Sequence, residues 1–146
     1  MNIKLRNFQF PDLNSIVKIE NASFSVDAYP KKRFEKLWRL HSKDFIVAKL
    51  RDKIIGYIIA YPKRYFIDFD SLAVDKKYRK LGIGKKLVNF MLNRFKKKGL
   101  KRALLEVKTT NKTAIAFYQK LGFKIKKTLK DYYRDKADAY QMEKIL

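Results

Sequence analysis

The sequence predicts an α/β (α+β) protein with a mixed, mostly antiparallel central sheet of six to seven strands and helices on both faces. Two observations lead to this prediction. Strand-like segments at residues 44–50 and 54–61, each rich in apolar residues, flank a short polar turn, which is typical of an antiparallel hairpin. Strand-like and helix-like segments then alternate between residues 65 and 129, which is typical of crossover connections in a sheet.

The first half of the chain is expected to form one strand, two helices and this hairpin. Residues 2–8 alternate between apolar and basic side chains, as a strand with one buried face does. Pro11 and Asp12 are typical of the first turn of a helix, and a second helix is expected over residues 30–40. Pro62 is expected to end the second arm of the hairpin, because proline cannot donate to a strand ladder.

The second half is expected to contribute four strands and two helices. Strand patterns lie at residues 65–74, 101–108, 123–129 and 137–146, and helix patterns at residues 82–98 and 111–121. No repeat, linker or low-complexity segment divides the chain, so we expect one domain over residues 1–146.

The composition narrows the classes of function. The 146 residues are 47% hydrophobic, which is enough for one core, and the absence of cysteine excludes disulfides, zinc–thiolate sites and a cysteine nucleophile. The single histidine, His41, lies in a polar segment and is expected near the surface. No apolar run approaches the ~20 residues of a membrane span, and no signal peptide is recognisable, so we expect a cytoplasmic protein.

The formal net charge is +22, and the basic residues are distributed over nearly the whole chain. The positive electrostatic field of such a protein favours anionic partners, including nucleotides, phosphorylated cofactors, nucleic acid and the ribosome. Charge alone does not choose between an enzyme that uses an anionic cofactor and a basic module that binds RNA or ribosomes.

A short basic loop with two glycines follows the strand expected at residues 65–74 and leads into a helix. Its residues are Arg79, Lys80, Leu81, Gly82, Ile83, Gly84 and Lys85. Backbone N–H groups at the start of a helix, beside basic side chains, suit a phosphate, and the glycines let a ligand approach the backbone. The alternative is an ordinary strand-to-helix turn with solvated lysines, and neither the Walker nor the Rossmann spacing is present.

Glu106 is a carboxylate within the apolar strand expected at residues 101–108. Burial of a glutamate is costly unless the group is paired or has a function. A salt bridge with a neighbouring lysine such as Lys108 is the structural alternative to a role in proton transfer.

Asn111 and Tyr118 are about two turns apart on one face of the helix that follows, with the small Ala114 between them. Together they border a shallow groove with a polar group at each end. The alternatives are an N-cap role for Asn111 and, for Tyr118, a place at the edge of the core with its hydroxyl in water.

The motifs over residues 71–142 together resemble the GCN5-related N-acetyltransferase (GNAT) family, in its RimI and archaeal Ard1 branch of N-terminal protein acetyltransferases. The segments that carry this resemblance are residues 79–84, 105–107, 111–123, 131–133 and 138–142. The resemblance implies a single GNAT domain that transfers an acetyl group from acetyl-CoA, with CoA as the product. The cofactor-binding residues that it implies are Leu72, Ala73, Val74, Arg79, Lys80, Leu81, Gly82, Ile83, Gly84, Lys85, Asn111 and Tyr118.

The resemblance also implies the catalytic roles and the acceptor. Glu106, directly or through water, would accept a proton from the incoming amine, and Tyr118 would protonate the departing thiolate. Transfer would be direct, which agrees with the lack of cysteine. No metal is expected. The implied acceptor is the α-amine of a protein N-terminus, with a lysine side chain or a small amine as the alternative.

The substrate slot that the resemblance implies is lined by Phe24, Tyr29, Tyr132 and Tyr133. Loop and hairpin packing is the alternative role for these four side chains. Residues 25–29 lack the tryptophan-containing turn of the bacterial pattern, so the preferred first residues of the substrate stay open. The positive charge is expected to favour acidic N-termini or substrates on ribosomes, and the chain is expected to be a monomer or homodimer.

Overall fold

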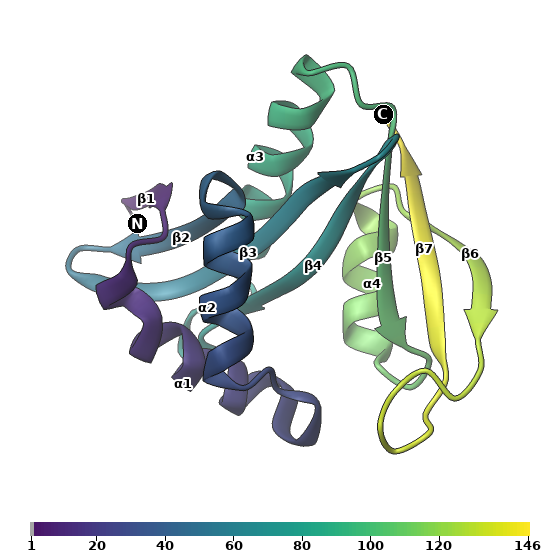
Figure 1. Ribbon diagram of the computed structural model, residues 1–146, viewed down its shortest axis with the longest axis horizontal. Coiled ribbons are helices and arrows are strands. Elements are labelled where there is room, and N and C mark those ends of the chain that lie inside the picture. The colour runs from purple at the N-terminus through teal and green to yellow at the C-terminus, as the bar shows by residue number, and fades with distance from the viewer. Residues whose placement is uncertain (1) are drawn as a thin grey trace. The chain divides into compact units, whose positions relative to one another are not determined.

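The computed structural model describes residues 2–146, and its elements follow one another in the order expected from the sequence (Figure 1). The strands are β1 (Ile3–Asn7), β2 (Phe45–Leu50), β3 (Lys53–Lys63), β4 (Phe66–Val74), β5 (Arg102–Lys108), β6 (Lys124–Leu129) and β7 (Ala139–Ile145). The α-helices are α1 (Leu13–Phe24), α2 (Lys31–Leu40), α3 (Ile83–Lys97) and α4 (Lys112–Lys120).

The strands form a seven-stranded sheet in the order β1-β2-β3-β4-β5-β7-β6. The pairs β1–β2, β2–β3, β5–β7 and β6–β7 are antiparallel. Strands β4 and β5 are parallel and pair Ile67 with Ala103 and Asp68 with Leu104. The parallel pair is joined through α3, as a crossover connection requires. These pairings confirm the predicted mixed, mostly antiparallel sheet.

Two expectations about element ends were wrong. Strand β3 continues through Pro62 to Lys63, because a proline at the last residues of a strand removes only one donor before the chain turns at Arg64. The first helix is preceded by a separate 3₁₀ turn, Phe10–Asp12. Asp12 fixes this turn, since its carboxylate accepts hydrogen bonds from the Arg6 guanidinium at 2.7 and 2.9 Å and from the Gln9 N–H at 2.8 Å.

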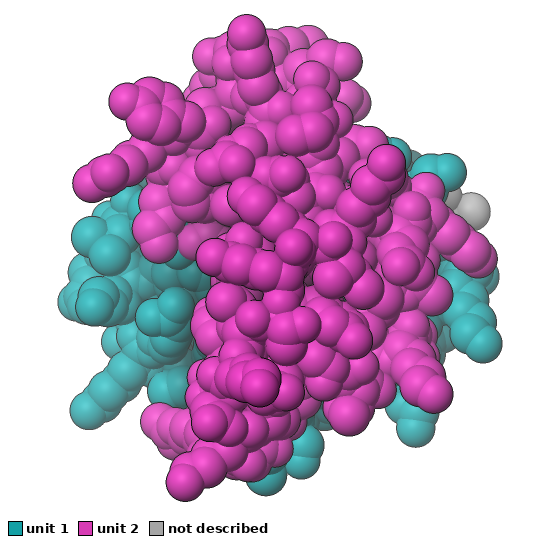
Figure 2. Space-filling view, turned by 90° about the vertical axis from the view of Figure 1, so that its right-hand side faces the viewer, with its two compact units in different colours: residues 1–61, 70–91 teal, residues 62–69, 92–146 magenta. Residues whose placement is uncertain are grey.

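The contacts within the chain form two compact units, residues 1–61 with 70–91 and residues 62–69 with 92–146 (Figure 2). In the first unit, α2 lies in front of strands β2 and β3 and the start of α3 lies behind them (Figure 1). Phe34 of α2 packs edge-on against Tyr57 at 5.7 Å between ring centroids and lies 6.2 Å from the ring of Phe45. The expectation of one domain over the whole chain stays a prediction.

The second unit has its own apolar core. Strand β5 pairs with β7 along its whole length, from Arg102 with Ile145 to Lys108 with Ala139. The ring of Phe123, just after α4, packs edge-on against Phe69 at 5.8 Å and against Tyr118 at 5.5 Å. These contacts fix α4 and the start of β6 against the strands of this unit.

Glu20 is a buried carboxyl group in the first unit, with 1% of its surface exposed. One oxygen accepts a hydrogen bond from the Tyr57 hydroxyl and lies 3.4 Å from the Ser71 hydroxyl, and the other accepts from the Tyr29 N–H at 2.8 Å. Burial raises the pKa of Glu20, although these hydrogen bonds oppose the effect. The cluster ties α1, β3 and β4 to the loop before α2.

The raised pKa of Glu20 predicts a pH-dependent stability. The folded carboxyl group binds its proton more tightly than the unfolded one, so the stability that this group contributes falls as pH rises from the unfolded pKa through the folded pKa. Between about pH 3 and about pH 8, the difference in free energy of unfolding between Glu20→Gln and the unsubstituted protein should shift in favour of Glu20→Gln. Urea denaturation over this pH range measures the difference.

The matched control is Glu35→Gln, because Glu35 is not buried in this way. Its stability difference from the unsubstituted protein should change little over the same pH range. A pH-independent difference for Glu20→Gln would contradict the burial argument.

Candidate functional site

The glycine-containing loop of the first unit has the conformation that its sequence suggested. Strand β4 ends at Val74, a 3₁₀ turn follows at Lys76–Tyr78, and α3 begins at Ile83. Gly82 has a φ of +83°, and its carbonyl accepts the first helical hydrogen bond, from Lys86 N–H at 3.0 Å. A left-handed φ is adopted readily by glycine and with strain by other residues.

The start of α3 presents groups that suit an anion. The first N–H groups of a helix have no partner within the helix, and here they belong to Ile83, Gly84 and Lys85. A Cβ added to Gly82 would meet no protein atom within 4 Å, so the space beside its backbone is open. Lys80 and Lys85 are exposed, whereas Ile83 is buried and holds the helix in the core.

Arg79 has a structural role that the sequence did not reveal. Its Nε donates to the Val74 carbonyl at 3.0 Å, and its Nη2 donates to the Ser23 hydroxyl at 3.0 Å. The side chain therefore ties the loop to the end of β4 and to α1. Its expected role in binding the cofactor stays a prediction.

The end of β4, Leu72 to Val74, lies close to β3. A Cβ on Gly56 of β3 would come within 3.1 Å of the Ala73 carbonyl oxygen, so glycine permits this close approach. The Asp75 N–H donates to the Ile55 carbonyl at 2.7 Å and continues the contact beyond the strand. The segment expected to bind the pantetheine arm is therefore held rigidly from one side.

Tyr29 and Phe24, the two slot residues expected in the first unit, lie at the edge of its apolar core. The Tyr29 hydroxyl donates to Asp70 Oδ1 at 2.6 Å, and its backbone N–H donates to Glu20. Two carboxyl groups thus fix Tyr29 at both ends. Asp70 and Glu20 are not among the residues predicted from the sequence, although Glu20 follows Leu13 and Ile16 at helical spacing, which indicates burial.

In the second unit, the structure brings Glu106 and Tyr132 together. Leu105 and Val107 are buried on one face of β5, and Glu106 points to the other. The Tyr132 hydroxyl donates to Glu106 Oε1 at 3.3 Å. Lys108, the lysine considered as a salt-bridge partner of Glu106, forms an ion pair with Asp135 at 3.0 Å.

Tyr133 completes the pair expected from the final hairpin. Its ring packs edge-on against Tyr132 at 5.1 Å, and the Lys108 ammonium lies 5.3 Å from its centroid. The N–H of Tyr133 also donates to the Ala137 carbonyl at 3.2 Å. These contacts hold the loop before β7 against the strand that carries Glu106.

The N-cap interpretation of Asn111 is confirmed, because its side-chain oxygen accepts from the Ala114 N–H at 3.2 Å. Tyr118, two turns along α4, packs edge-on between Phe117 at 5.0 Å and Phe123 at 5.5 Å. Burial raises the pKa of the Tyr118 hydroxyl well above its ordinary value. Even without this shift a phenol is protonated throughout the physiological pH range.

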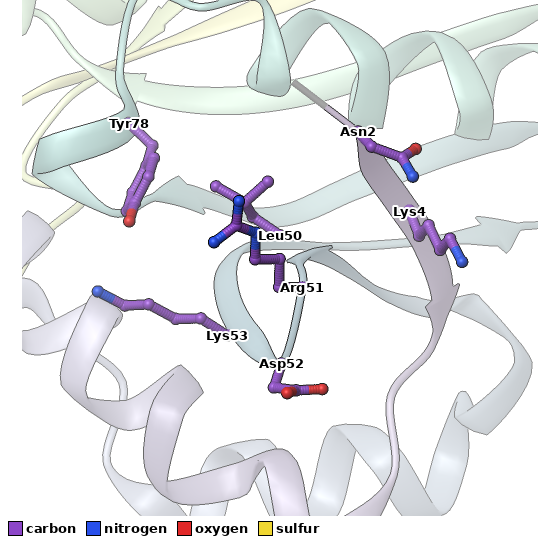
Figure 3. Close-up of a pocket in the computed structure, with 7 residues that line it drawn as sticks. All are labelled: Asn2, Lys4, Leu50, Arg51, Asp52, Lys53 and Tyr78. Carbon is purple, nitrogen blue, oxygen red and sulfur yellow. The ribbon is translucent and has the colours of Figure 1, made fainter.

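A separate pocket of about 820 Å³ lies at the turn between β2 and β3 (Figure 3). Its lining comes from β1, from this turn and from the segment before α3, and consists of Asn2, Lys4, Leu50, Arg51, Asp52, Lys53 and Tyr78. The Lys53 ammonium lies 5.3 Å from the centre of the Tyr78 ring and 3.8 Å from Asp75. None of the residues predicted to bind cofactor or substrate lines this pocket, so its size does not make it the site.

Within residues 2–146, no group of three or more histidine, cysteine, aspartate or glutamate side chains is arranged to hold a metal ion. Among the helices of the same residues, none combines the length and the apolar character needed to cross a membrane.

Comparison with known families decides the class of protein. The model of the acetyltransferase (GNAT) family matches residues 13–123. The chain belongs to the GNAT family. A GNAT relative named N-alpha-acetyltransferase, from Sulfurisphaera tokodaii, is 32% identical over 152 aligned positions that cover 95% of this chain and 90% of the relative.

Solved structures agree with this assignment. Ard1 from Thermoplasma volcanium matches this GNAT chain with a TM-score of 0.95 and 29% identity, covering 100% of this chain and 99% of that one. Naa50 from Arabidopsis thaliana, solved in complex with the bisubstrate analogue CoA-Ac-MVNAL, matches with a TM-score of 0.82 and 27% identity, covering 99% of each chain.

The open space beside Gly82 leads to a prediction for this acetyltransferase. In Gly82→Val, the branched side chain would fill that space and force a strained φ, so coenzyme A should no longer raise the melting temperature. Differential scanning fluorimetry with and without coenzyme A measures the effect.

Gly99→Val is the matched control, because Gly99 also has a left-handed φ, of +88°, and open space around its added Cβ. Both variants should lose roughly 1–3 kcal/mol of stability through backbone strain, but only Gly82→Val should lose the response to coenzyme A. Equal responses in the two variants would show that the loop does not bind the cofactor.

Proposed function

We propose that this chain transfers the acetyl group of acetyl-CoA to the α-amine of protein N-termini. The observation that carries the proposal is the contact between Glu106 and the Tyr132 hydroxyl, because it joins the expected base to a residue expected to line the peptide slot. Two further findings support it. Relatives at 32% identity are named N-alpha-acetyltransferase, and the similar Naa50 was solved with an analogue that joins CoA to a peptide.

The residues present fit a diphosphate-bearing cofactor. Gly82 leaves open space beside the backbone, and the exposed Lys80 and Lys85 supply positive charge at the start of α3. When bound, acetyl-CoA supplies the acetyl group as an activated thioester. The backbone of residues 80–85 would hold its diphosphate, residues 72–74 would pair with its pantetheine arm, and Asn111 would contact that arm.

The proton transfers are assigned to two side chains of the second unit. Glu106 would accept a proton from the incoming amine, either directly or through a water molecule. An α-amine has a pKa of about 8, so only modest assistance is needed near neutral pH. The Tyr118 hydroxyl is protonated near neutral pH, as a phenol of ordinary pKa also is, and would donate a hydrogen bond or its proton to the departing sulfur.

The finer expectations stay predictions. A lysine side chain or a small amine is the alternative acceptor, because the geometry of Glu106 alone does not distinguish one primary amine from another. Ribosome association through the basic surface, a cytoplasmic location and a monomeric or homodimeric state rest on the sequence alone.

The acceptor is tested by incubating the protein with acetyl-CoA and peptides that carry both a free α-amine and an internal lysine. Fragment-ion mass spectrometry then locates the added acetyl group. Acetylation of the α-amine is expected. Acetylation of lysine alone, or transfer only to small amines, would contradict the proposal.

The role of Glu106 gives a second prediction. Glu106→Gln should lower kcat at neutral pH by about a hundredfold, while coenzyme A still raises the melting temperature. The deficit should shrink above about pH 8, because the α-amine then loses its proton without assistance. A steady-state pH profile measures this recovery.

The matched control is Glu143→Gln on the neighbouring strand β7, which forms ion pairs with Arg102 at 2.9 Å and Lys126 at 3.4 Å. Its kcat should change little at any pH. Unchanged turnover in Glu106→Gln would mean that another group acts as the general base, and it would contradict the assignment of this role to Glu106.

A further inference from the structure

Asp70, in the middle of β4, lies at the centre of a polar cluster in the first unit, with partners on α2, on the loop before α2 and near the end of β3. Its Oδ1 accepts from the Tyr29 hydroxyl and its Oδ2 from the Tyr61 hydroxyl, both at 2.6 Å. Arg33 of α2 forms an ion pair with the same Oδ2 at 3.5 Å. The cluster thus assembles one carboxylate, two phenols and one guanidinium around a residue of the expected slot.

The two charges of the cluster differ in their access to solvent. The Asp70 side chain is only 5% exposed, and both of its oxygens accept hydrogen bonds, so it is not available to a substrate. The Arg33 side chain is 43% exposed. The charge that a visiting molecule would meet is therefore positive.

The Arg33 guanidinium is held in place from two sides. Its central carbon lies 4.7 Å from the centre of the Tyr29 ring, and Asp70 pairs with its Nη2. A guanidinium presents five N–H donors in a planar fork, and this ion pair uses only one end of it. Holding the fork in advance reduces the entropy lost when a carboxylate binds.

The other charged side chains of α2 are mostly positive, like Arg33 itself. Helix α2 also carries Lys31, Lys32, Lys36 and Arg39 against a single acidic residue, Glu35. An anionic side chain that approaches Tyr29 therefore meets a positive field as well as a specific partner.

We propose that Arg33 is a specificity-determining residue that selects peptides with an acidic first side chain, with Asp70 and Tyr29 holding its guanidinium toward the slot. This inference rests on the proposed function, because it needs a peptide α-amine as acceptor and Tyr29 as part of the slot. It names the class of substrate: N-termini that begin with aspartate or glutamate.

The test uses the full chain, acetyl-CoA and three peptides that differ only in a first residue of Glu, Gln or Lys. The quantity measured is kcat/KM for α-amine acetylation, followed by mass spectrometry. The unsubstituted protein should prefer Glu over Gln by about threefold to tenfold, and Gln over Lys. In Arg33→Gln the preference for Glu over Gln should disappear, while activity on the Gln peptide is retained.

Two further variants distinguish a specific contact of the Arg33 guanidinium from the general positive charge of α2. Arg33→Lys keeps the charge but loses the planar fork, so it should retain part of the preference. Arg39→Gln makes the same change in net charge further along α2 and should retain all of it. Melting temperatures check that each variant is folded, which is expected because Arg33 is half-exposed.

Failure of the proposed function and failure of the Arg33 inference would give different results in this experiment. If no peptide gains an acetyl group on its α-amine, the proposed function fails and this inference fails with it. If the peptides are acetylated but Arg33→Gln leaves the Glu-to-Gln ratio unchanged, or the unsubstituted protein prefers Lys, only the role of Arg33 is overturned.

Discussion

The left-handed turn at Gly82 is the constraint on which the functional account depends. β4 ends at Val74, and after the 3₁₀ turn at Lys76–Tyr78 the left-handed Gly82 leads directly into α3 at Ile83. A Cβ on Gly82 would meet no protein atom within 4 Å, so the space beside the backbone at the start of the helix is open. Arg79 fastens the loop to the Val74 carbonyl, and the buried Ile83 fastens the helix to the core. Rigid donors that need no rearrangement bind an anion at a lower entropic cost than flexible lysines would.

The fold separates the roles that an acetyl transfer needs. The first unit contains the loop suited to a diphosphate, and it holds Tyr29 by two carboxyl groups, Glu20 and Asp70. The second unit contains the two groups proposed for proton transfer, Glu106 on a strand and Tyr118 on a helix, both fixed by regular secondary structure. Groups on strands and helices keep their geometry better than groups on loops, which suits proton transfer.

Much of the fold could be predicted from periodicity and turn residues. The order of elements and the crossover through α3 followed from the hairpin pattern and from apolar spacing at Ile83, Leu87 and Met91. The end of β3 was misplaced, because the effect of Pro62 depends on whether its missing N–H had a partner in the ladder, which local sequence does not specify. The N-cap role of Asn111 was predictable because it is a local interaction between residues three apart.

The polar clusters of the site were not predictable in the same way. Asp70 contacts Tyr29 and Arg33 from 37 or more positions away in the chain, and such pairings depend on the folded sheet. The same holds for Tyr132 and Glu106, which are 26 residues apart. The structural role of Arg79 was hidden for this reason too, since its partner Ser23 lies on α1.

The central claim is that this chain binds a diphosphate-bearing thioester cofactor at the start of α3. Isothermal titration of coenzyme A into the protein tests it most directly. The account predicts saturable binding of one molecule per chain, weakened by inorganic pyrophosphate that competes for the same backbone donors. Titration without binding heat at several temperatures, or binding indifferent to pyrophosphate, would contradict the claim.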